Sequence, residues 1–394
     1  MSNPENASHP TDSSVVVLLR CDEYDPARVA ETVSRGISML GGIRQFATPE
    51  DRILLKPNLL VGKRPERAVT THPAVFEAVA RCFQEAGATV TYGDSPGFGR
   101  IETIARRAGI GAVADALDIP LADFRTGKTV SFPEGHAIKQ FEIAVGALEA
   151  DGIVSLSKLK THALTRMTGA VKNLFGCIPG MLKGEFHGRL TDVERFSAML
   201  VDLNRLLRPR LHIMDGIVAM EGNGPHNGRP RALRSLLFST DPVALDAVMC
   251  RLVHLEPTLM ATEVWGERLG LGRHTRVTVI GDAVETLACS EFDVNRKTDF
   301  SVHMVHPLIS RLMKNYVTPR PVLCAERCIR CGNCVKICPV TPKALDFQDS
   351  GETEPPRYNY KQCIRCYCCQ EMCPEGAIEV ETPLLGRIAR RLPL

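Results

Sequence analysis

Eight cysteines near the carboxyl end of this 394-residue chain fall into two runs with the same spacing. The runs read CIRCGNCVKICP from Cys328 to Pro339 and CIRCYCCQEMCP from Cys363 to Pro374, and both follow C-x2-C-x2-C-x3-C-P. A [4Fe–4S] cluster needs four thiolates around a cube, and this spacing lets one loop supply three of them. The runs therefore predict two [4Fe–4S] clusters within residues 323–382.

The fourth ligand of each cluster is expected from the other run, because in paired runs of this kind the last cysteine crosses over. Cluster 1 then has the ligands Cys328, Cys331, Cys334 and Cys373, and cluster 2 has Cys363, Cys366, Cys369 and Cys338. At every ligand position the segment resembles the bacterial two-cluster ferredoxins. The resemblance implies a small α+β, ferredoxin-like domain that carries electrons. A zinc ribbon would need two C-x2-C pairs, which leaves four of these cysteines unexplained.

Three further cysteines have no role that the sequence assigns: Cys177, Cys324 and Cys368. Cys324 and Cys368 lie near the two runs but fit neither ligand set. They either pack beside the clusters or include a redox-sensitive thiol.

The chain before the cysteine runs alternates short runs of Val, Ile and Leu with segments whose apolar residues have helical spacing. The short runs lie at 15–19, 52–55, 89–92, 152–156, 211–214, 235–238 and 277–280. Helices are expected at 72–87 and at 191–207, where Thr191 and Glu194 have capping-box spacing. Apolar strands that alternate with helices predict an α/β fold, a mostly parallel sheet with helices on both faces. Residues 129–144 instead suggest an antiparallel hairpin.

These patterns divide the chain into five predicted segments. They are a disordered tail at 1–13, the α/β domain at 14–285, a connecting arm at 286–322, the two-cluster domain at 323–382 and a basic tail at 383–394. One amphipathic helix is expected within 306–321. The last segment is half apolar, so it either contacts a partner or membrane surface or is a docked or frayed end.

Charge and hydropathy exclude several classes of protein. The net charge of +3 is too balanced for a nucleic-acid-binding protein. No apolar run approaches the roughly 20 residues of a transmembrane helix, and the N-terminus lacks the features of a secretory signal. We therefore expect a cytoplasmic protein. Thiols stay reduced there, so the clustering of ten of the fifteen cysteines between Cys324 and Cys373 indicates metal rather than disulfides.

Polar segments follow the predicted strands, at the edge where open parallel sheets bind ligands. They include residues 56–58, 93–99, 157–162, 215–225, 239–242 and 281–282. Asp241 before Pro242 is also a good helix N-cap, and Asp215 and Asp282 beside glycine are also ordinary turn residues. The candidate substrate-binding residues are Lys56, Asn58, Asp94, Ser95, Lys158, Arg166, Lys172, Asn173, Asp215 and Asn223.

One stretch, SKLKTHALTRMTGAVKNLFGCIPG at 157–180, contains several cations and almost no acidic residue. Cations without nearby carboxylates favour an external anion, a phosphate or carboxylate, although a solvated basic face is the alternative. Within this stretch Lys160 and His162 are the candidate catalytic residues, Lys158 and Lys160 are candidate anchors, and His162 is the expected proton donor. These four cations, Lys158, Lys160, Arg166 and Lys172, are expected to share a cleft with Asp94 and Ser95.

A set of motifs in the α/β domain resembles the domain-of-unknown-function 362 family. The motifs are LLKPNLL, TTHPAVFEAVA, YGDSPGFG, SLSKLKTHALTRMTGAVKNLFGCIPG, DGIVAMEGNGPHNGRPR and STDPVALDAVMC. Members are often described as iron–sulfur centre proteins with a C-terminal two-cluster ferredoxin module. The resemblance covers most of the chain and implies a redox function, but it indicates no general substrate and no catalytic residues.

Three functions are consistent with these observations. The first is a ferredoxin-dependent reductase, in which two [4Fe–4S] clusters take electrons from an external donor such as ferredoxin or flavodoxin and pass them to a small anionic substrate. The second is an electron-transfer or assembly factor that docks a protein partner. The third is a metal- or cofactor-handling protein that uses Asp94, His162, Asp215 or Glu221. No NAD or flavin motif is found, and the sequence does not indicate the oligomeric state.

Overall fold

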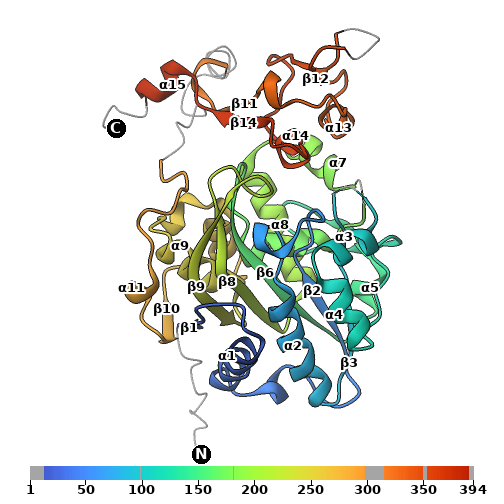
Figure 1. The fold of residues 1–394 in the computed structure, drawn as a ribbon, viewed down its shortest axis with the longest axis vertical. Helices are drawn as coiled ribbons and strands as arrows, with labels where there is room; N and C mark the ends of the chain where they lie inside the picture. Colours follow the sequence, from blue (N-terminus) through green and yellow to red (C-terminus); the bar gives the residue numbers. More distant parts are fainter. Residues whose placement is uncertain (1–12, 98, 181, 298–314, 349–352, 390–394) are drawn as a thin grey trace, which may run out of the picture.

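The computed structural model describes residues 13–97, 99–180, 182–297, 315–348 and 353–389, and its larger part is built on an eight-stranded sheet (Figure 1). The strand order is β10-β1-β9-β8-β6-β2-β3, with the short β7 beside β6. The strands are β1 (Ser14–Arg20), β2 (Arg52–Pro57), β3 (Thr89–Tyr92), β6 (Gly152–His162), β7 (Arg166–Met167), β8 (Leu211–Glu221), β9 (Arg229–Ser239) and β10 (Val277–Gly281). Each predicted apolar run lies within one of these strands.

The sheet is mostly parallel, as predicted, but β9 runs the other way. β9 pairs antiparallel with both β1 and β8, whereas β1 is parallel to β10, and β6 is parallel to β2 and β8. The expectation that residues 239–242 belong to the binding edge is therefore wrong, because the carboxyl end of β9 lies at the opposite edge. Asp241 caps helix α9 (Pro242–Leu252) there by accepting hydrogen bonds from the amides of Val243 and Ala244.

Two strands extend well beyond their predicted ends. β6 continues to His162, so the basic segment 157–162 is strand rather than loop. All eleven residues of β6 are buried. β8 continues to Glu221, which pairs with Arg229 of β9. Residues 222–228, GNGPHNG, therefore form the turn of a long hairpin that projects from the carboxyl edge of the sheet.

Helices cover both faces of the sheet, as predicted. α1 (Pro26–Met39), α2 (Pro73–Glu85), α3 (Ile101–Arg107) and α4 (Ile110–Ala116) pack on one face in a core with Val17 and Leu55. The other face is covered by α6 (Gly169–Asn173), α8 (Val193–Leu207) and α9 (Pro242–Leu252). The remaining helices of this part are α5 (Val145–Leu148), α7 (Leu182–Arg189), α10 (Ala261–Arg268) and α11 (Val284–Leu287).

The local predictions mostly agree with the structure. The predicted hairpin at 129–144 is the antiparallel pair β4 (Gly127–Ser131) and β5 (Gln140–Ala144). The predicted capping box at Thr191 is wrong, because Asp192 caps α8 by accepting from the amide of Glu194. Most of the helix expected within 306–321 lies outside the described residues.

The cysteine runs form a small α+β module with two short antiparallel strand pairs. β11 (Arg320–Leu323) pairs with β14 (Ile378–Glu381), and β12 (Leu345–Asp346) pairs with β13 (Arg357–Tyr358). Its helices are α13 (Asn333–Lys336), α14 (Cys368–Glu371) and α15 (Leu384–Ala389). The module lies over the carboxyl ends of the sheet strands, with α14 nearest to the larger part (Figure 1). Among the described residues, none of the helices is both long and apolar enough to cross a bilayer.

Candidate functional site

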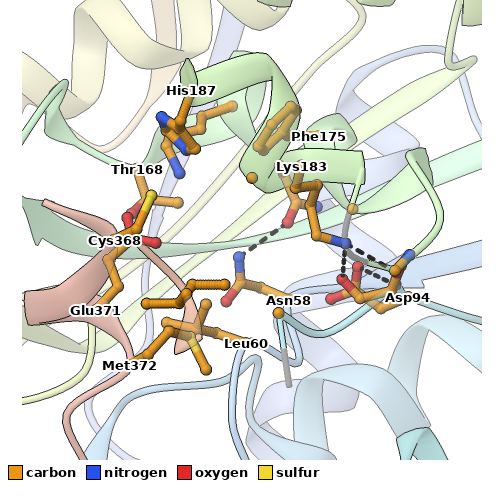
Figure 2. A pocket seen from close by; sticks show the side chains of 18 of the residues that line it. Asn58, Leu60, Asp94, Thr168, Phe175, Lys183, His187, Cys368, Glu371 and Met372 are labelled. Carbon is orange, nitrogen blue, oxygen red and sulfur yellow. Dashed lines mark hydrogen bonds between the residues drawn. The ribbon is translucent and has the colours of Figure 1, made fainter. Parts of the chain in front are cut away.

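A cavity lies between the carboxyl edge of the sheet and the cysteine module (Figure 2). It has about 740 Å³ of empty space, open mouth included. Cys368, Glu371 and Met372 of the module face Asp94 and Lys183 of the larger part across it. Its other lining residues include Lys56, Asn58, Leu60, Ser95, Thr168, Lys172, Asn173, Phe175, His187 and Ile337. Both parts of the chain are thus needed to form its wall.

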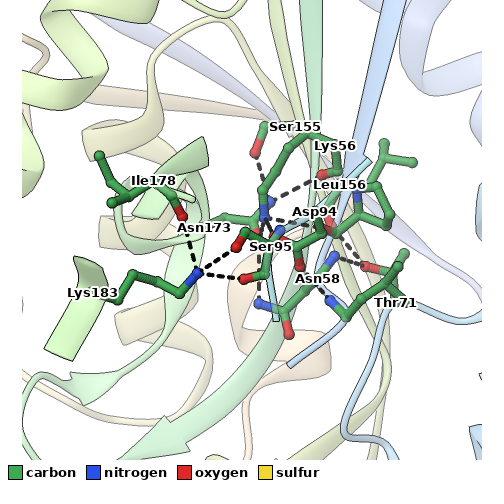
Figure 3. Close-up of polar contacts among 12 residues, drawn as sticks. Lys56, Asn58, Thr71, Asp94, Ser95, Ser155, Leu156, Asn173, Ile178 and Lys183 are labelled. Carbon is green, nitrogen blue, oxygen red and sulfur yellow. Dashed lines mark hydrogen bonds and ion pairs between the residues drawn. The ribbon is translucent and has the colours of Figure 1, made fainter. Parts of the chain in front are cut away.

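The floor of the cavity is a buried polar network at the ends of β2 and β3 (Figure 3). Lys56 Nζ lies 2.9 Å from Asp94 Oδ1 and donates to Asn173 Oδ1 over 3.2 Å. Asn173 Oδ1 also accepts from Asn58 Nδ2 at 3.1 Å. Asp94 Oδ2 accepts from the amide of Leu59 at 2.7 Å. These mutual bonds fix the side chains before any ligand binds, which reduces the entropy that binding must overcome.

Gly176 allows this network to form because it has no side chain, so its backbone packs directly against the Lys56–Asp94 ion pair. A Cβ atom at this position would lie 1.8 Å from Asp94 Oδ1 and 2.6 Å from Lys56 Nζ. Any larger residue would therefore separate Lys56 from Asp94.

Two lysines that line the cavity form no ion pair with a described carboxylate, although the charge of Glu371 acts on Lys172 and that of Asp94 acts on Lys183. Lys183 Nζ donates to the carbonyl and hydroxyl oxygens of Ser95, at 2.7 and 2.8 Å, and to the carbonyl of Ile178. Burial lowers the pKa of Lys183 to about 7, although Asp94 opposes the shift. Lys172 Nζ lies 5.9 Å from the ring centroid of Phe175 and makes no hydrogen bond to any described residue. Burial lowers its pKa as well. Both lysines offer positive charge to a ligand.

The structure brings six of the ten predicted substrate-binding residues to this cavity: Lys56, Asn58, Asp94, Ser95, Lys172 and Asn173. Of the four cations predicted to share a cleft with Asp94 and Ser95, only Lys172 lines the cavity, so the prediction is wrong for Lys158, Lys160 and Arg166. Lys158 Nζ instead pairs with Asp215 Oδ2 at 2.7 Å and donates to Tyr24 at 2.9 Å. Arg166 donates to the carbonyls of Leu259 and Asn295.

Lys160 supports the floor from beneath rather than lining it. Its Nζ donates to Asn58 Oδ1 over 2.8 Å and to the carbonyl of Val69 over 2.6 Å. Burial and the nearby charge of Lys172 hold its pKa well below the usual range.

His162 ends β6 and contacts the module instead of the cavity. Its Nδ1 accepts from the amides of Leu164 and Thr165, so the proton of the neutral ring is on Nε2. Nε2 pairs with Oε1 of Glu371 in α14. Burial, with Lys172, lowers the pKa of His162 to about 4, whereas Glu371 opposes the shift. Both ring nitrogens are occupied, so the predicted direct proton transfer from His162 to a substrate does not fit this geometry.

The hairpin turn at 222–228 contacts the module, and the predicted substrate-binding residue Asn223 takes part in this contact. Gln370 Nε2 donates to Asn223 Oδ1 over 2.7 Å and to the carbonyl of Gly224 over 3.0 Å. Asn227 Nδ2 donates to the carbonyl of Cys373 over 3.2 Å. Sequence reasoning missed this role because polar and glycine residues in a turn look the same whether they face solvent or another domain.

The carboxylates proposed for metal handling are each engaged elsewhere. Asp94 pairs with Lys56, Asp215 with Lys158, and Glu221 with Arg231 at 2.9 Å. In the described parts of the chain, no three His, Cys, Asp or Glu side chains lie close enough to hold one metal ion.

The cysteines predicted to hold cluster 1 surround a hollow with about 340 Å³ of empty space, open mouth included. Its lining contains all four of them: Cys328, Cys331, Cys334 and Cys373. The pKa of Cys334 is raised to about 12, by burial and then by the charges of the other three. The amide of Ala377 also donates to Cys373 Sγ over 3.2 Å. Hydrogen bonds of this kind to ligand sulfur are among the features that tune cluster potentials. The residues present therefore fit a [4Fe–4S] cluster.

Three cysteines of the second predicted ligand set, Cys363, Cys366 and Cys369, lie near one another on the side of the module toward the cavity. Burial and the charges of Cys366 and Cys363 raise the pKa of Cys369, whose Sγ lies 3.2 Å from the hydroxyl of Tyr358. Cys366 packs against the cluster of Ile337, Cys368 and Met372. The fourth predicted ligand, Cys338, is buried and follows the cavity residue Ile337.

The cysteines outside the ligand sets differ in their surroundings. Cys368 lines the cavity. Cys324 Sγ lies 2.9 Å from a carboxylate oxygen of Glu326. Cys177 is buried, and burial raises its pKa to about 12.

Sequence reasoning also missed several cavity residues. Lys183 and His187 lie on α7, and Glu371 lies between two cysteines of the second run. Glu371 could have been found from the sequence, because it is an ionisable residue between two predicted ligand cysteines. Lys183 follows the basic stretch 157–180 by only a few residues, but no motif or spacing distinguishes it.

An α/β domain whose binding edge is covered by a cysteine module defines an iron–sulfur electron-transfer protein. Residues 53–251 match a domain of unknown function, DUF362, and residues 327–377 match the 4Fe-4S dicluster domain. The chain belongs to the DUF362 family.

Other known proteins are similar over parts of the chain. The thylakoid-associated protein sll1697 of Synechocystis sp. is 42% identical over 257 residues, which is 65% of this chain and 79% of that protein. The lactate racemase apoprotein from Thermoanaerobacterium thermosaccharolyticum has a TM-score of 0.39 at 13% identity, over 61% of this chain and 57% of its own. A Thermotoga maritima protein has a TM-score of 0.33 at 13% identity, over 64% and 61%. The chain spans less than two thirds of either solved structure.

Proposed function

We propose that this protein is a reductase that passes electrons from its iron–sulfur module to a small anionic organic substrate in the shared cavity. The observation that carries the proposal is that the module and the α/β domain line one cavity. A flat apolar surface at the strand ends would have favoured the docking of a protein partner. Here the chain's own module covers these ends and leaves beneath it a space lined by apolar side chains and by Lys56, Lys172 and Lys183.

Residues beside the second ligand set connect the module to the cavity. Ile337 precedes Cys338, and Cys368 contacts Cys366, while both Ile337 and Cys368 line the cavity. Met372 lines it too and packs in one cluster with Ile337 and Cys368. When bound, two clusters supply one electron each. This arrangement gives those electrons a short route to a molecule in the cavity.

The charges around the cavity favour an anion. Lys172 and Lys183 form no ion pair with a described carboxylate, whereas Lys56 already pairs with Asp94. Three lysines thus line the cavity against two carboxylates, Asp94 and Glu371. Leu60, Phe175, Ile337 and Met372 supply apolar surface for the rest of the molecule. We therefore propose a carboxylate or phosphate group bound by Lys172 and Lys183, with an organic body against the apolar side.

The reaction must also supply protons. A two-electron reduction of an unsaturated bond adds two electrons and two protons to the substrate, and no other bond needs to break. Lys183 lines the cavity and carries a proton that it can lose near neutral pH, so we assign it as one proton donor and water as the other. His162 and Lys160 act as positioning residues, through Glu371 and Asn58 respectively.

The electron donor and the location of the protein are also proposals. An external one-electron carrier such as ferredoxin or flavodoxin would reduce the module. We propose that the protein works in the cytoplasm. The name of the Synechocystis relative is compatible with a peripheral position at a membrane surface.

The test is a single-turnover experiment on anaerobically purified protein with its clusters. Small molecules that copurify are identified by mass spectrometry, and each is added to protein whose clusters have been reduced with dithionite. We expect one small anion to accelerate cluster reoxidation and to be recovered in reduced form. Lys172→Gln should weaken this effect at unchanged iron content. If no small anion accelerates reoxidation, the reductase proposal fails.

A further inference from the structure

Helix α15 of the module leaves its apolar side chains exposed. Leu384, Leu385 and Ile388 are 72%, 55% and 50% exposed. Eight large hydrophobic side chains are exposed in the parts of the chain that the structure describes, and these are three of them. Ile388 follows Leu384 by four residues and Leu385 by three, so the three side chains lie on one side of the helix. α15 therefore presents a small apolar face to solvent.

The opposite side of α15 packs on the module and fixes the helix. Gly386 is buried, and a Cβ atom at this position would lie 2.1 Å from the carbonyl oxygen of Val317. Arg387 Nε donates to the carbonyl of Thr382 over 2.8 Å. The helix lies at the outer end of the module, away from the sheet (Figure 1). The apolar face is therefore held in place at a distance from the substrate cavity.

Arginines accompany this apolar face. Residues 382–394 contain no carboxylate and three arginines: Arg387, Arg390 and Arg391. The side chain of Arg387 is exposed. A guanidinium group matches the geometry of phosphate and binds it through two hydrogen bonds. The segment therefore combines exposed apolar side chains with groups that bind anions.

The carboxylates that precede this segment do not cancel its charge. Glu379 and Glu381 lie on β14 and are exposed. Glu379 forms an ion pair with Arg327, and Glu381 lies opposite Arg320 in the β11–β14 pair, where opposite charges interact. Each carboxylate thus has its own arginine in the module. The three arginines of 382–394 remain as excess positive charge.

We propose that α15 binds the surface of a lipid bilayer that contains anionic lipids. Leu384, Leu385 and Ile388 enter the boundary between headgroups and acyl chains, and Arg387 binds lipid phosphate. Neither cavity described above includes a residue of α15. A bilayer needs no groove, because it accepts apolar side chains anywhere on its surface and its phosphates complement the arginines. The inference concerns where the protein is held, so it does not depend on the reaction in the cavity.

The test is cosedimentation of the whole chain, purified with its clusters, with lipid vesicles. One set of vesicles contains phosphatidylcholine alone, and the other contains phosphatidylcholine and phosphatidylglycerol. We expect binding to the anionic vesicles only, and weaker binding as the ionic strength rises. Arg387→Glu should weaken this binding about ten-fold, and the double variant Leu384→Ser with Ile388→Ser should weaken it about as much. The iron and sulfide content of both variants should equal that of the wild type.

Two surface variants elsewhere are matched controls. Arg195→Glu reverses the charge of an exposed arginine on α8, and Leu148→Ser removes an exposed leucine on α5. Neither should change vesicle binding. Equal loss of binding in Arg195→Glu and Arg387→Glu would overturn the proposal, because the attraction would then depend on net charge alone.

Absence of binding to anionic vesicles, or wild-type binding by the double variant, would also overturn the proposal. A further contrary outcome is a dimer in solution that the double variant abolishes, with no vesicle binding. In that case a second copy of the chain, rather than a bilayer, covers the apolar face of α15.

Discussion

Nε2 of the neutral His162 ring contacts Oε1 of Glu371 and joins the end of β6 to helix α14. The pair ties the centre of the sheet to the segment between the ligand cysteines Cys369 and Cys373. Although burial opposes it, the interaction with His162 and the charge of Lys172 lower the pKa of Glu371 below its usual range. The position of α14 therefore depends on a contact that is almost completely buried, and α14 forms one wall of the cavity.

Replacement of His162 by phenylalanine should loosen the module. The substitution leaves the carboxylate of Glu371 buried without its donor, which costs about 3 kcal/mol. We expect faster amide hydrogen exchange in α14 and in residues 222–228, with iron content unchanged. His162→Gln keeps a donor and should behave nearly as the wild type. Equal exchange in the wild type and His162→Phe would show that the pair does not hold the module.

The crossed ligand sets predict how cysteine variants lose iron. The intact protein should contain eight iron atoms, four for each of two clusters. Cys373→Ala should impair the cluster held by Cys328, Cys331 and Cys334, although Cys373 belongs to the second run. Iron and sulfide analysis with electron paramagnetic resonance of the reduced protein checks this. Zinc in place of iron, or four irons with Cys363→Ala harmless, contradicts the assignment.

Gly176→Ala should destroy the cavity floor without affecting the module. The added methyl group would lie 1.8 Å from Asp94 Oδ1, so Asp94 and Lys56 must separate. We expect weaker binding of the copurifying anion, lower thermal stability and unchanged iron. Gly184→Ala is the control for stability, because nothing lies within 4 Å of a Cβ there. Unchanged stability and binding in Gly176→Ala would mean that the network relaxes without cost.

Binding of the anion should weaken as the pH rises through about 7. The pKa of Lys183 is lowered to about 7 by burial, so its positive charge is present below that pH and lost above it. Asp94, Lys56, Cys177 and Lys172 also act on Lys183; the pKa of Cys177, about 12, keeps its thiol protonated in this range. A bound anion favours the charged form and moves the midpoint upward.

The matched variant is Lys183→Arg, which stays charged throughout this pH range. Its affinity for the anion should show no loss near pH 7 when measured by calorimetry. If the wild type and Lys183→Arg have the same pH profile, another group controls binding.

The sequence was informative where one local pattern determines the structure. Cysteine spacing indicated the two-cluster domain, and apolar runs specified the strands, because both depend on neighbours a few residues away. The direction of β9 was not predictable, since its apolar residues would suit either orientation between β1 and β8. The strand lengths were also missed, because lysines such as Lys158 and Lys160 are typical of loops. Both are buried in β6 because their ammonium groups have hydrogen-bond acceptors: Asp215 for Lys158, and Asn58 and the carbonyl of Val69 for Lys160.

The cavity itself was predictable only in part. Six of the predicted binding residues line it because they follow strands β2 and β3 or belong to α6, whose positions the α/β pattern implies. The module's contribution through Cys368, Glu371 and Met372 depends on how two folded parts meet. No periodicity or spacing within one segment encodes that contact.

Half of the small core of the module consists of the cysteines Cys334, Cys369 and Cys373, beside Leu345, Ala377 and Ile378. A core of this composition depends on bound metal for its stability, since thiolates without iron repel one another. The same module supplies one wall of the cavity. We therefore expect a newly made chain to complete this cavity only after its iron and sulfide have been inserted, so that cluster insertion would act as a checkpoint for ligand binding.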